Sequence, residues 1–327
     1  MEPGADKLKN DELSCTGMSG SDDGRVRFEK PDMDWIRESG MLCADMHFHT
    51  NHSDSFTTVK DALALAKKRD VGLAITDHNL VAGSLEAKDL NKDYSRFLVP
   101  GIEISSWDGP HILVYFYTFD EMREYWQKSV KPHMSGNPWL AINKGTEWIL
   151  DSLEDVNCVV SAAHPLGYLG SVKGVQKAID AGVLEKDVVD RLDAYEVICS
   201  GMFHNENVGA LRHAREYGIG FTGGTDGHLL SELGRVLTVS EATDLDEFLD
   251  DIVKQRNTIV GREKHIPKKF VMGATSMTRF GMHLPSAAHR KMQIAANHGT
   301  KNYPEKGKRL QRSQADGIIQ HTDGPPH

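Results

Sequence analysis

The chain has 327 residues, of which 39% are hydrophobic, and its formal net charge is −9. This length and apolar content fit one large α/β domain with extensions, or two smaller domains, and no apolar run is long enough to cross a membrane. The negative charge argues against strong long-range attraction to a nucleic-acid duplex.

Both ends of the chain are polar. Residues 1–34 have mixed charge and predict a flexible leader that lacks the apolar core of a secretory signal. Residues 267–327 have little apolar periodicity and more basic than acidic residues, which predicts a basic, disordered tail. The four cysteines are scattered singly. That distribution fits a reducing compartment better than a disulfide framework and predicts a cytoplasmic protein.

Between residues 35 and 266, short apolar runs alternate with amphipathic stretches. In chain order, the predicted strands cover residues 41–49, 71–76, 97–105, 111–119, 157–163, 193–198, 219–225 and 234–239. The predicted helices cover residues 58–70, 138–156, 174–183, 205–218 and 245–256. Thr57 or Thr58 suits the N-cap of the first helix, and Gly218 suits the C-cap of the fourth. Repeated β-then-α units predict a mostly parallel sheet or barrel.

The first long strand carries an unusual density of ionisable side chains, in the stretch "CADMHFHTNHSD". Alternate residues of a strand share a face, so Asp45, His47 and His49 are expected to point the same way. Burying such groups unpaired is costly, and a divalent metal ion removes that cost by binding imidazoles and carboxylates. The alternative is a solvated edge strand with incidental histidines.

Further histidines and acidic residues end other predicted strands. These residues are the Asp77–His78 pair, Glu103, His164 and the Asp226–His228 stretch, and His111 opens the strand after Glu103. In barrels, the loops that follow the strands build the functional site at the carboxyl ends of those strands. Chance rarely places such groups at so many strand ends, so the pattern favours a metal site over an edge strand.

These motifs resemble those of the PHP (polymerase and histidinol phosphatase) family of metal-dependent phosphoesterases. The resemblance covers roughly residues 42–262 and includes "DMHFHT" followed by "SD", "ITDH", "GIEIS" followed by a histidine, "AHP", and "GGTDGH". It implies a distorted (βα)7 TIM-like barrel over residues 35–266. The stretch "GIEISSW" is similar to the small members of the family that act on nucleotides or short oligonucleotides.

The resemblance also implies two or three divalent ions, with manganese, zinc and iron all compatible with the ligands. His47, His49, Glu103 and Asp226 would bind the first ion. Glu103 would bridge to a second ion bound by His111 and His164. A third ion would be bound by Asp54, His78 and His228, although His52 competes with Asp54 for that role.

The roles implied for these residues are catalytic as well as structural. A metal-activated hydroxide would attack phosphorus, with Glu103 as the bridge and Asp226 or His228 passing a proton. Asp45, Asp77 and Glu196 suit the role of orienting the ligand imidazoles.

The expected partner is a small phosphorylated substrate, such as a nucleotide or short oligonucleotide. The alternatives are a phosphomonoesterase of the histidinol-phosphatase type, a metal-dependent amidohydrolase and a non-catalytic scaffold. No membrane or protein partner is inferred.

Overall fold

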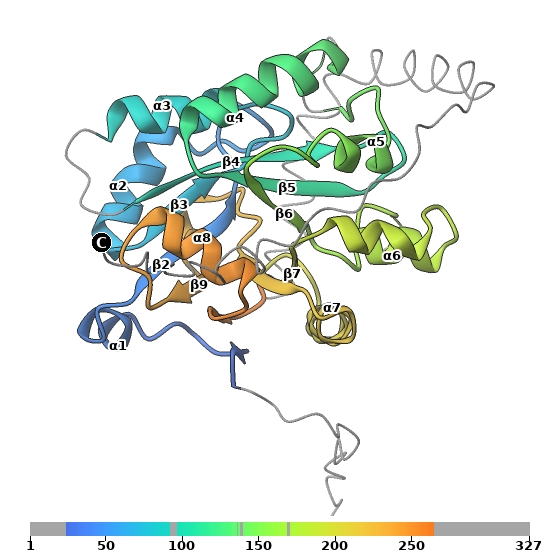
Figure 1. The fold of residues 1–327 in the computed structure, drawn as a ribbon. Coiled ribbons are helices and arrows are strands. Elements are labelled where there is room, and N and C mark those ends of the chain that lie inside the picture. The colour runs from blue at the N-terminus through green and yellow to red at the C-terminus, as the bar shows by residue number, and fades with distance from the viewer. Residues whose placement is uncertain (1–23, 92–96, 136, 138–139, 169–170, 265–327) are drawn as a thin grey trace, which may run out of the picture.

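The computed structural model describes residues 24–91, 97–135, 137, 140–168 and 171–264 (Figure 1). Within the predicted leader, residues 24–34 are ordered, because strand β1 (Val26–Arg27) pairs in parallel with β10 (Thr258–Gly261) and helix α1 (Met33–Glu38) begins at Met33. Residues 1–23 and the predicted basic tail, 267–327, lie outside the described residues.

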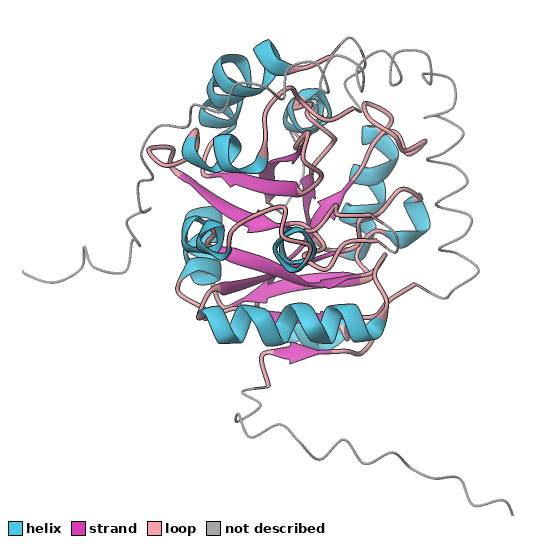
Figure 2. Cartoon of the chain, turned by 90° about the vertical axis from the view of Figure 1, so that its right-hand side faces the viewer, coloured by secondary structure: helices cyan, strands magenta, loops and turns pink. Residues whose placement is uncertain are grey.

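The described strands form one ten-stranded sheet in the order β1-β10-β9-β2-β3-β4-β5-β6-β7-β8. In chain order, the strands that follow β1 and precede β10 are β2 (Leu42–Phe48), β3 (Gly72–Ile75), β4 (Leu98–Ser105), β5 (His111–Phe116), β6 (Cys158–Ala162), β7 (Ala194–Cys199), β8 (Gly220–Gly224) and β9 (Val236–Ser240). Helices lie around the outside of the curled strands (Figure 2). The predicted α/β class is therefore confirmed.

The sheet departs from the predicted (βα)7 barrel because several of its neighbours are antiparallel. Strands β4 and β5 pair antiparallel, as do β5 and β6, and β9 pairs antiparallel with both β2 and β10. The turn between β4 and β5 is short and is closed by a hydrogen bond from Ser106 N to Pro110 O (3.0 Å). A connection of that length joins antiparallel strands, whereas parallel neighbours need a longer crossover.

The last strand of the sheet curls back toward β2. Just beyond β8, Gly227 forms a parallel bridge with Phe48, and His49 N donates to Gly227 O at 2.9 Å. Gly224 packs so closely on β2 that a Cβ atom there would lie 2.4 Å from His47 Cβ. The sheet is thus a strongly curled, mixed half-barrel, and its polar strand β2 is covered from both sides.

All five predicted helices are present, and all except α7 are shorter than predicted. The structure has α2 (Val59–Arg69), α5 (Thr146–Asp151), α6 (Val175–Asp180), α7 (His204–Tyr217) and α8 (Leu245–Val253). Thr58 caps α2 by accepting from Asp61 N, and Gly218 ends α7 with a φ of 67°, a left-handed conformation that glycine adopts freely.

The predicted helix 138–156 shrinks to α5. Residues 138 and 139 lie outside the described residues, and the next residues pair with the end of β4 instead. Ile142 N donates to Ser105 O (2.8 Å), and Trp107 N donates to Lys144 O (3.0 Å), so helix begins only after Gly145. Sequence periodicity also missed α3 (Ala82–Leu90) and α4 (Phe119–Tyr125). Among the described residues, no helix has the length and apolar character needed to cross a bilayer.

Candidate metal centre

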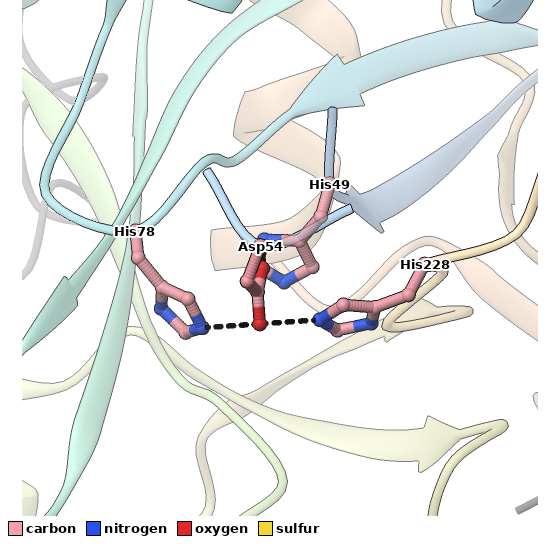
Figure 3. A group of neighbouring side chains, drawn as sticks. All are labelled: His49, Asp54, His78 and His228. Atoms are coloured by element: carbon pink, nitrogen blue, oxygen red, sulfur yellow. Dashed lines mark hydrogen bonds and ion pairs between the residues drawn. The ribbon is translucent and has the colours of Figure 1, made fainter. Parts of the chain in front are cut away.

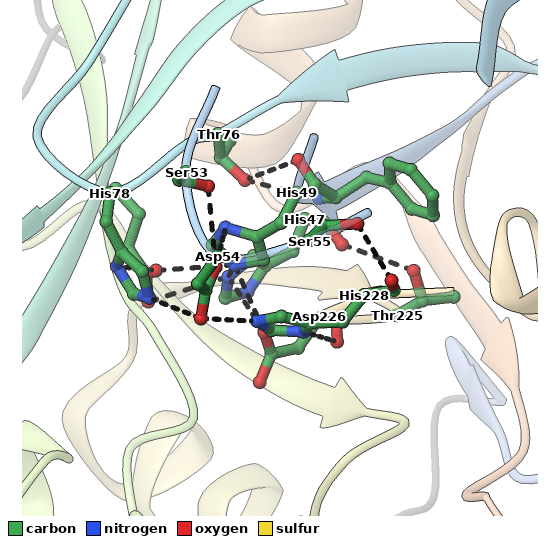
Figure 4. A network of polar contacts seen from close by, with 12 residues as sticks. His47, His49, Ser53, Asp54, Ser55, Thr76, His78, Thr225, Asp226 and His228 are labelled. Atoms are coloured by element: carbon green, nitrogen blue, oxygen red, sulfur yellow. Dashed lines mark hydrogen bonds and ion pairs between the residues drawn. The ribbon is translucent and has the colours of Figure 1, made fainter. Parts of the chain in front are cut away.

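The strand ends bring all of the predicted ligands together at one end of the curled sheet. Figure 4 labels His47, His49, Asp54, His78, Asp226 and His228 among them. Because β5 runs antiparallel to β4, its first residue, His111, pairs with Ser105 and meets the same end. The assembled ligands are His47, His49, Asp54, His78, Glu103, His111, His164, Asp226 and His228.

Glu103 lies at the middle of this group and is fully buried. Its Oε1 atom is 3.0 Å from His111 Nδ1 and 3.2 Å from His164 Nε2. Its Oε2 atom is 2.8 Å from His78 Nδ1 and 3.5 Å from His49 Nε2. One carboxylate therefore faces imidazoles from four different segments, as a bridging ligand must.

Asp54 forms the second focus, between two histidines (Figure 3). Its Oδ2 atom is 2.9 Å from His228 Nε2 and 3.7 Å from His78 Nε2, and its Oδ1 atom is 3.7 Å from His49 Nδ1. These ring nitrogens and the carboxylate lie within 4.8 Å of one another, which is compatible with one ion between them. The group is wider than the sequence implied, since it includes His49 as well as the three predicted residues.

Asp226 faces the two histidines of β2. Its Oδ1 atom lies 3.2 Å from His49 Nε2 and 3.6 Å from His47 Nε2. The two Nε2 atoms of His47 and His49 are themselves only 3.2 Å apart. Two ring nitrogens at that distance can share one proton or bind one metal ion, but they cannot both be protonated without repulsion.

The buried donor set fits divalent metal ions. His49 Nδ1 and His164 Nδ1 are buried and have no hydrogen-bond partner. Buried polar atoms are normally satisfied, so two such ring nitrogens in one cluster are available to a further partner, as a metal ion would be. Two further candidate groups, His47–His49–Glu103 and His78–Glu103–His111, share Glu103. Imidazole and carboxylate together suit manganese, zinc or iron.

Neighbouring imidazoles and carboxylates in this cluster shift one another's pKa values. Burial alone would lower the pKa of His47, but nearby carboxylates, that of Glu196 foremost, raise it well above its ordinary value. Burial alone would raise the pKa of Glu103, but nearby imidazoles, that of His78 foremost, lower it well below its ordinary value. Burial lowers the pKa of His111 to about 3, so this ring offers a lone pair at neutral pH. A metal ion bound by His47 would compete with this proton, so we expect metal affinity to rise with pH.

Of the three residues expected to orient imidazoles, Glu196 alone contacts a ring nitrogen. Its Oε1 atom is 3.0 Å from His47 Nδ1, and its Oε2 atom accepts from His164 N at 2.7 Å. This contact leaves His47 Nε2 facing the cluster.

Asp45 and Asp77 contact backbone amides and hydroxyl groups rather than ring nitrogens. Asp45 accepts from Thr225 N (2.9 Å) and Gly234 N (2.8 Å) and so fixes the segments after β8 and before β9. Asp77 accepts from Thr50 N (2.7 Å) and from the Ser53 hydroxyl (2.6 Å). Both aspartates brace backbone that carries the ligands, a role that alternation along a strand cannot reveal.

Tyr168 belongs to the site and was missed in the sequence. Its hydroxyl donates to Asp226 Oδ2, and its ring centroid lies 5.1 Å from that of His164. Gly201 makes room for this contact, because a Cβ atom there would lie 2.7 Å from the tyrosine hydroxyl. The sequence signal was limited to a tyrosine four residues after His164, in "HPLGY".

His52 and Asp54 compete in the sequence for one ligand position, and the structure separates them. His52 Nε2 lies 2.5 Å from Glu86 Oε2, away from the groups around Asp54. We therefore expect Asp54→Ala to lower the affinity of one metal position by roughly 10-fold or more, the scale of losing a residue that binds or supports a metal. His52→Ala should leave metal binding unchanged. Metal titration of both variants checks this, and the reverse pattern would reassign the ligand.

Part of the chain is similar in sequence to known proteins. Residues 204–257 match the PHP-associated family model, and this segment contains α7, β8, Asp226, His228 and α8. MJ1587, an uncharacterized protein of Methanocaldococcus jannaschii, is 29% identical over a region that covers 28% of this chain and 66% of that protein.

Solved structures extend the comparison to the fold. Endonuclease Q of Pyrococcus furiosus, a lesion-specific endonuclease, superposes with a TM-score of 0.53 and 17% identity over 67% of this chain and 57% of its own. Endonuclease Q in complex with a 27-mer duplex that has an abasic lesion gives 0.55 and 16%, over 68% of this chain and 60% of its own. A two-domain protein of Bacteroides vulgatus that contains a predicted PHP-like metal-dependent phosphoesterase gives 0.50 and 14%, over 73% of this chain and 69% of its own. At these identities the likeness concerns the fold. The chain therefore shares its fold with these PHP-like structures, and residues 204–257 are similar to the PHP-associated family.

Proposed function

We propose that the chain is a metal-dependent phosphoesterase that hydrolyses phosphate esters of nucleotides or short oligonucleotides. The observation that carries this proposal is the buried cluster of six imidazoles and three carboxylates, in which His49 and His164 each keep a ring nitrogen without a hydrogen-bond partner. A scaffold without catalytic function has no need of so many ionisable groups gathered in its interior. Cys43, Cys158 and Cys199, the cysteines among the described residues, are free and buried, which supports a cytoplasmic location.

Two or three divalent ions would be held by these residues. His47, His49 and Asp226 surround one position, and the shared carboxylate of Glu103 connects it to a second position beside His111 and His164. Asp54, His78 and His228 surround a third, with His49 close by. When bound, the ions would activate water and neutralise the charge that develops on phosphate oxygens.

The chain itself controls protons at two atoms. His228 Nδ1 lies 3.1 Å from the carbonyl oxygen of Asp226, which can only accept, so Nδ1 carries the proton and Nε2 faces Asp54. His228 Nε2 thereby presents a lone pair, which can bind an ion or take up a proton and then pass it to the leaving oxygen. Tyr168 holds one oxygen of Asp226 and leaves the other toward His49.

The nucleotide assignment rests on the "GIEISSW" stretch and on the fold shared with Endonuclease Q. That enzyme's complex contains a 27-mer duplex, but this chain matches only 60% of its length, so duplex binding is not carried over. With a net charge of −9, this chain has little long-range attraction for a polyanion. A short substrate needs only the ions and local contacts.

Two measurements test the proposal. The purified chain should contain two or three divalent ions, and its activity should vanish on chelation and return with manganese. Under one metal condition, a nucleoside bisphosphate and a trinucleotide should be cleaved with higher kcat/KM than histidinol phosphate. Protein with less than one ion that still turns over would overturn the mechanism, while a strong preference for histidinol phosphate would favour the phosphomonoesterase alternative. Hydrolysis of C–N bonds alone would favour the amidohydrolase alternative.

A further inference from the structure

A buried ion pair lies directly behind the segment that carries Asp226 and His228. Lys264 is the last described residue, three positions after β10, and its side chain is 0% exposed. Its Nζ atom lies 3.1 Å from Glu232 Oε2, and that side chain is also 0% exposed. Lysine and glutamate are rarely buried, because removing both charges from water costs several kcal/mol per ion. A pair at this depth therefore requires an explanation.

Both members of the pair bind the backbone of the metal segment. Glu232, in the short 3-10 helix Leu230–Glu232, accepts from His228 N (3.0 Å) and from Leu229 N (3.2 Å) through the same Oε2 atom that faces Lys264. Lys264 Nζ donates to the carbonyl oxygen of Asp226 at 3.0 Å. The ion pair thus forms hydrogen bonds to the backbone on both sides of Gly227, at Asp226 O and His228 N.

The Asp226 carbonyl connects this pair to the metal cluster. It accepts from Lys264 Nζ and also from His228 Nδ1, and the second bond fixes which nitrogen of His228 faces Asp54. Asp226 itself has a φ of 46°, in the left-handed region that non-glycine residues rarely occupy. Such a conformation persists only when the surroundings hold it, and here the lysine holds the carbonyl group of the strained residue.

Stability alone does not account for the pair. Glu232 Oε1 is buried and has no hydrogen-bond partner, so the carboxylate is only partly satisfied. A buried pair with an unsatisfied oxygen is a poor stabiliser, and apolar residues of similar volume often serve as well or better. What apolar residues cannot do is bind the amide of His228 and the carbonyl of Asp226 at once.

We propose that Lys264 and Glu232 are positioning residues, which hold Asp226 and His228 in the geometry that binds metal. The proposal rests on the metal centre of the proposed function. It predicts that the position bounded by His49, Asp54, His78 and His228 depends on this pair more than the Glu103–His111 side does. Substrate class plays no part in it, so it stands or falls separately from the phosphoesterase assignment.

The test measures metal binding rather than turnover. Lys264→Met and Glu232→Gln should each weaken one metal position by roughly 10- to 100-fold, the usual effect of removing a group that orients a ligand. Metal analysis at limiting manganese should then show about one ion fewer per chain, with the remaining ions retained. Glu232→Gln keeps the side-chain shape, so it reports on the pair even if Lys264→Met fails to fold.

The control is an ion pair away from the cluster in which only the arginine is buried. Arg191, 6% exposed, pairs with Asp151, and Arg191→Met should lower the melting temperature without altering metal content. If the Lys264 or Glu232 variants lose only stability, as Arg191→Met does, and bind every ion with wild-type affinity, the proposal is wrong. Loss of one ion with normal affinity at the others supports it, even if no phosphoester is hydrolysed by the wild type.

Discussion

Glu103→Gln is expected to lower kcat/KM of the metal-loaded protein at least about a hundredfold, the scale seen when a main charge-stabilising group is removed. The substitution preserves the shape of the side chain and removes its negative charge. Glu103 Oε2 lies within 3.5 Å of ring nitrogens of His49 and His78, and Oε1 lies 3.0 Å from His111 Nδ1. A neutral amide cannot balance two ions. Steady-state kinetics and metal analysis on the same preparation check the expectation.

Glu86→Gln supplies the matched control. Glu86 pairs with His52 and is 43% exposed, outside the candidate metal groups, so the same chemical change there should leave kcat/KM and metal content unaltered. A near-normal rate for Glu103→Gln, with all ions retained, would show that this carboxylate does not bridge.

Gly224→Ala is expected to destabilise the domain by about 3 kcal/mol and to remove metal binding with it. The added methyl group would lie 2.4 Å from His47 Cβ and 2.6 Å from His47 N. The second atom belongs to the backbone of β2 and cannot rotate away, so the two strands must separate. Overpacking a rigid contact of this kind costs 1–3 kcal/mol or more. Chemical denaturation and metal titration report the two effects.

Gly182 provides the control, because a side chain added there would not clash with any neighbouring atom. No heavy atom lies within 4 Å of a Cβ built there, although its φ of 68° disfavours most side chains. Gly182→Asn should therefore cost roughly 1 kcal/mol through backbone strain and leave metal binding intact. Equal stability of Gly224→Ala and the wild type would mean that β8 can move away from β2.

The residue pattern predicted which side chains gather in the candidate metal centre. The ligands sit at the ends of apolar runs, and because strand ends meet at one edge, the sequence alone predicted their gathering. It did not predict how His49 and His78 are shared between positions, since that depends on side-chain rotamers around Glu103. It also missed Tyr168 and Lys264, because a lone tyrosine in a loop and a lone lysine near a strand end have no periodic signal.

The fold was predicted less completely, for a related reason. Alternation and length identify a strand, but its direction in the sheet is set by the connection before it. The short turn before His111 makes β5 antiparallel, and β9 lies between β2 and β10, so the α/β class is confirmed but the regular (βα)7 arrangement is not. The predicted helix over 138–156 was too long because residues before Gly145 also show helical apolar spacing. In the structure, Ile142 instead bonds to the end of β4 through Ser105 O.

The covering of β2 by β8 also has a bearing on synthesis of the chain. Asp45 binds Thr225 across 180 residues, Asp54 meets His228 across 174, and His47 meets Glu196 across 149. Pairings of such long range form late, because the loops that they close carry a large entropic cost. On the ribosome, the histidines of β2 emerge long before the segments that enclose them. The metal centre is thus a product of the completed chain, and a prematurely terminated one exposes these ligands to water and to any available ion.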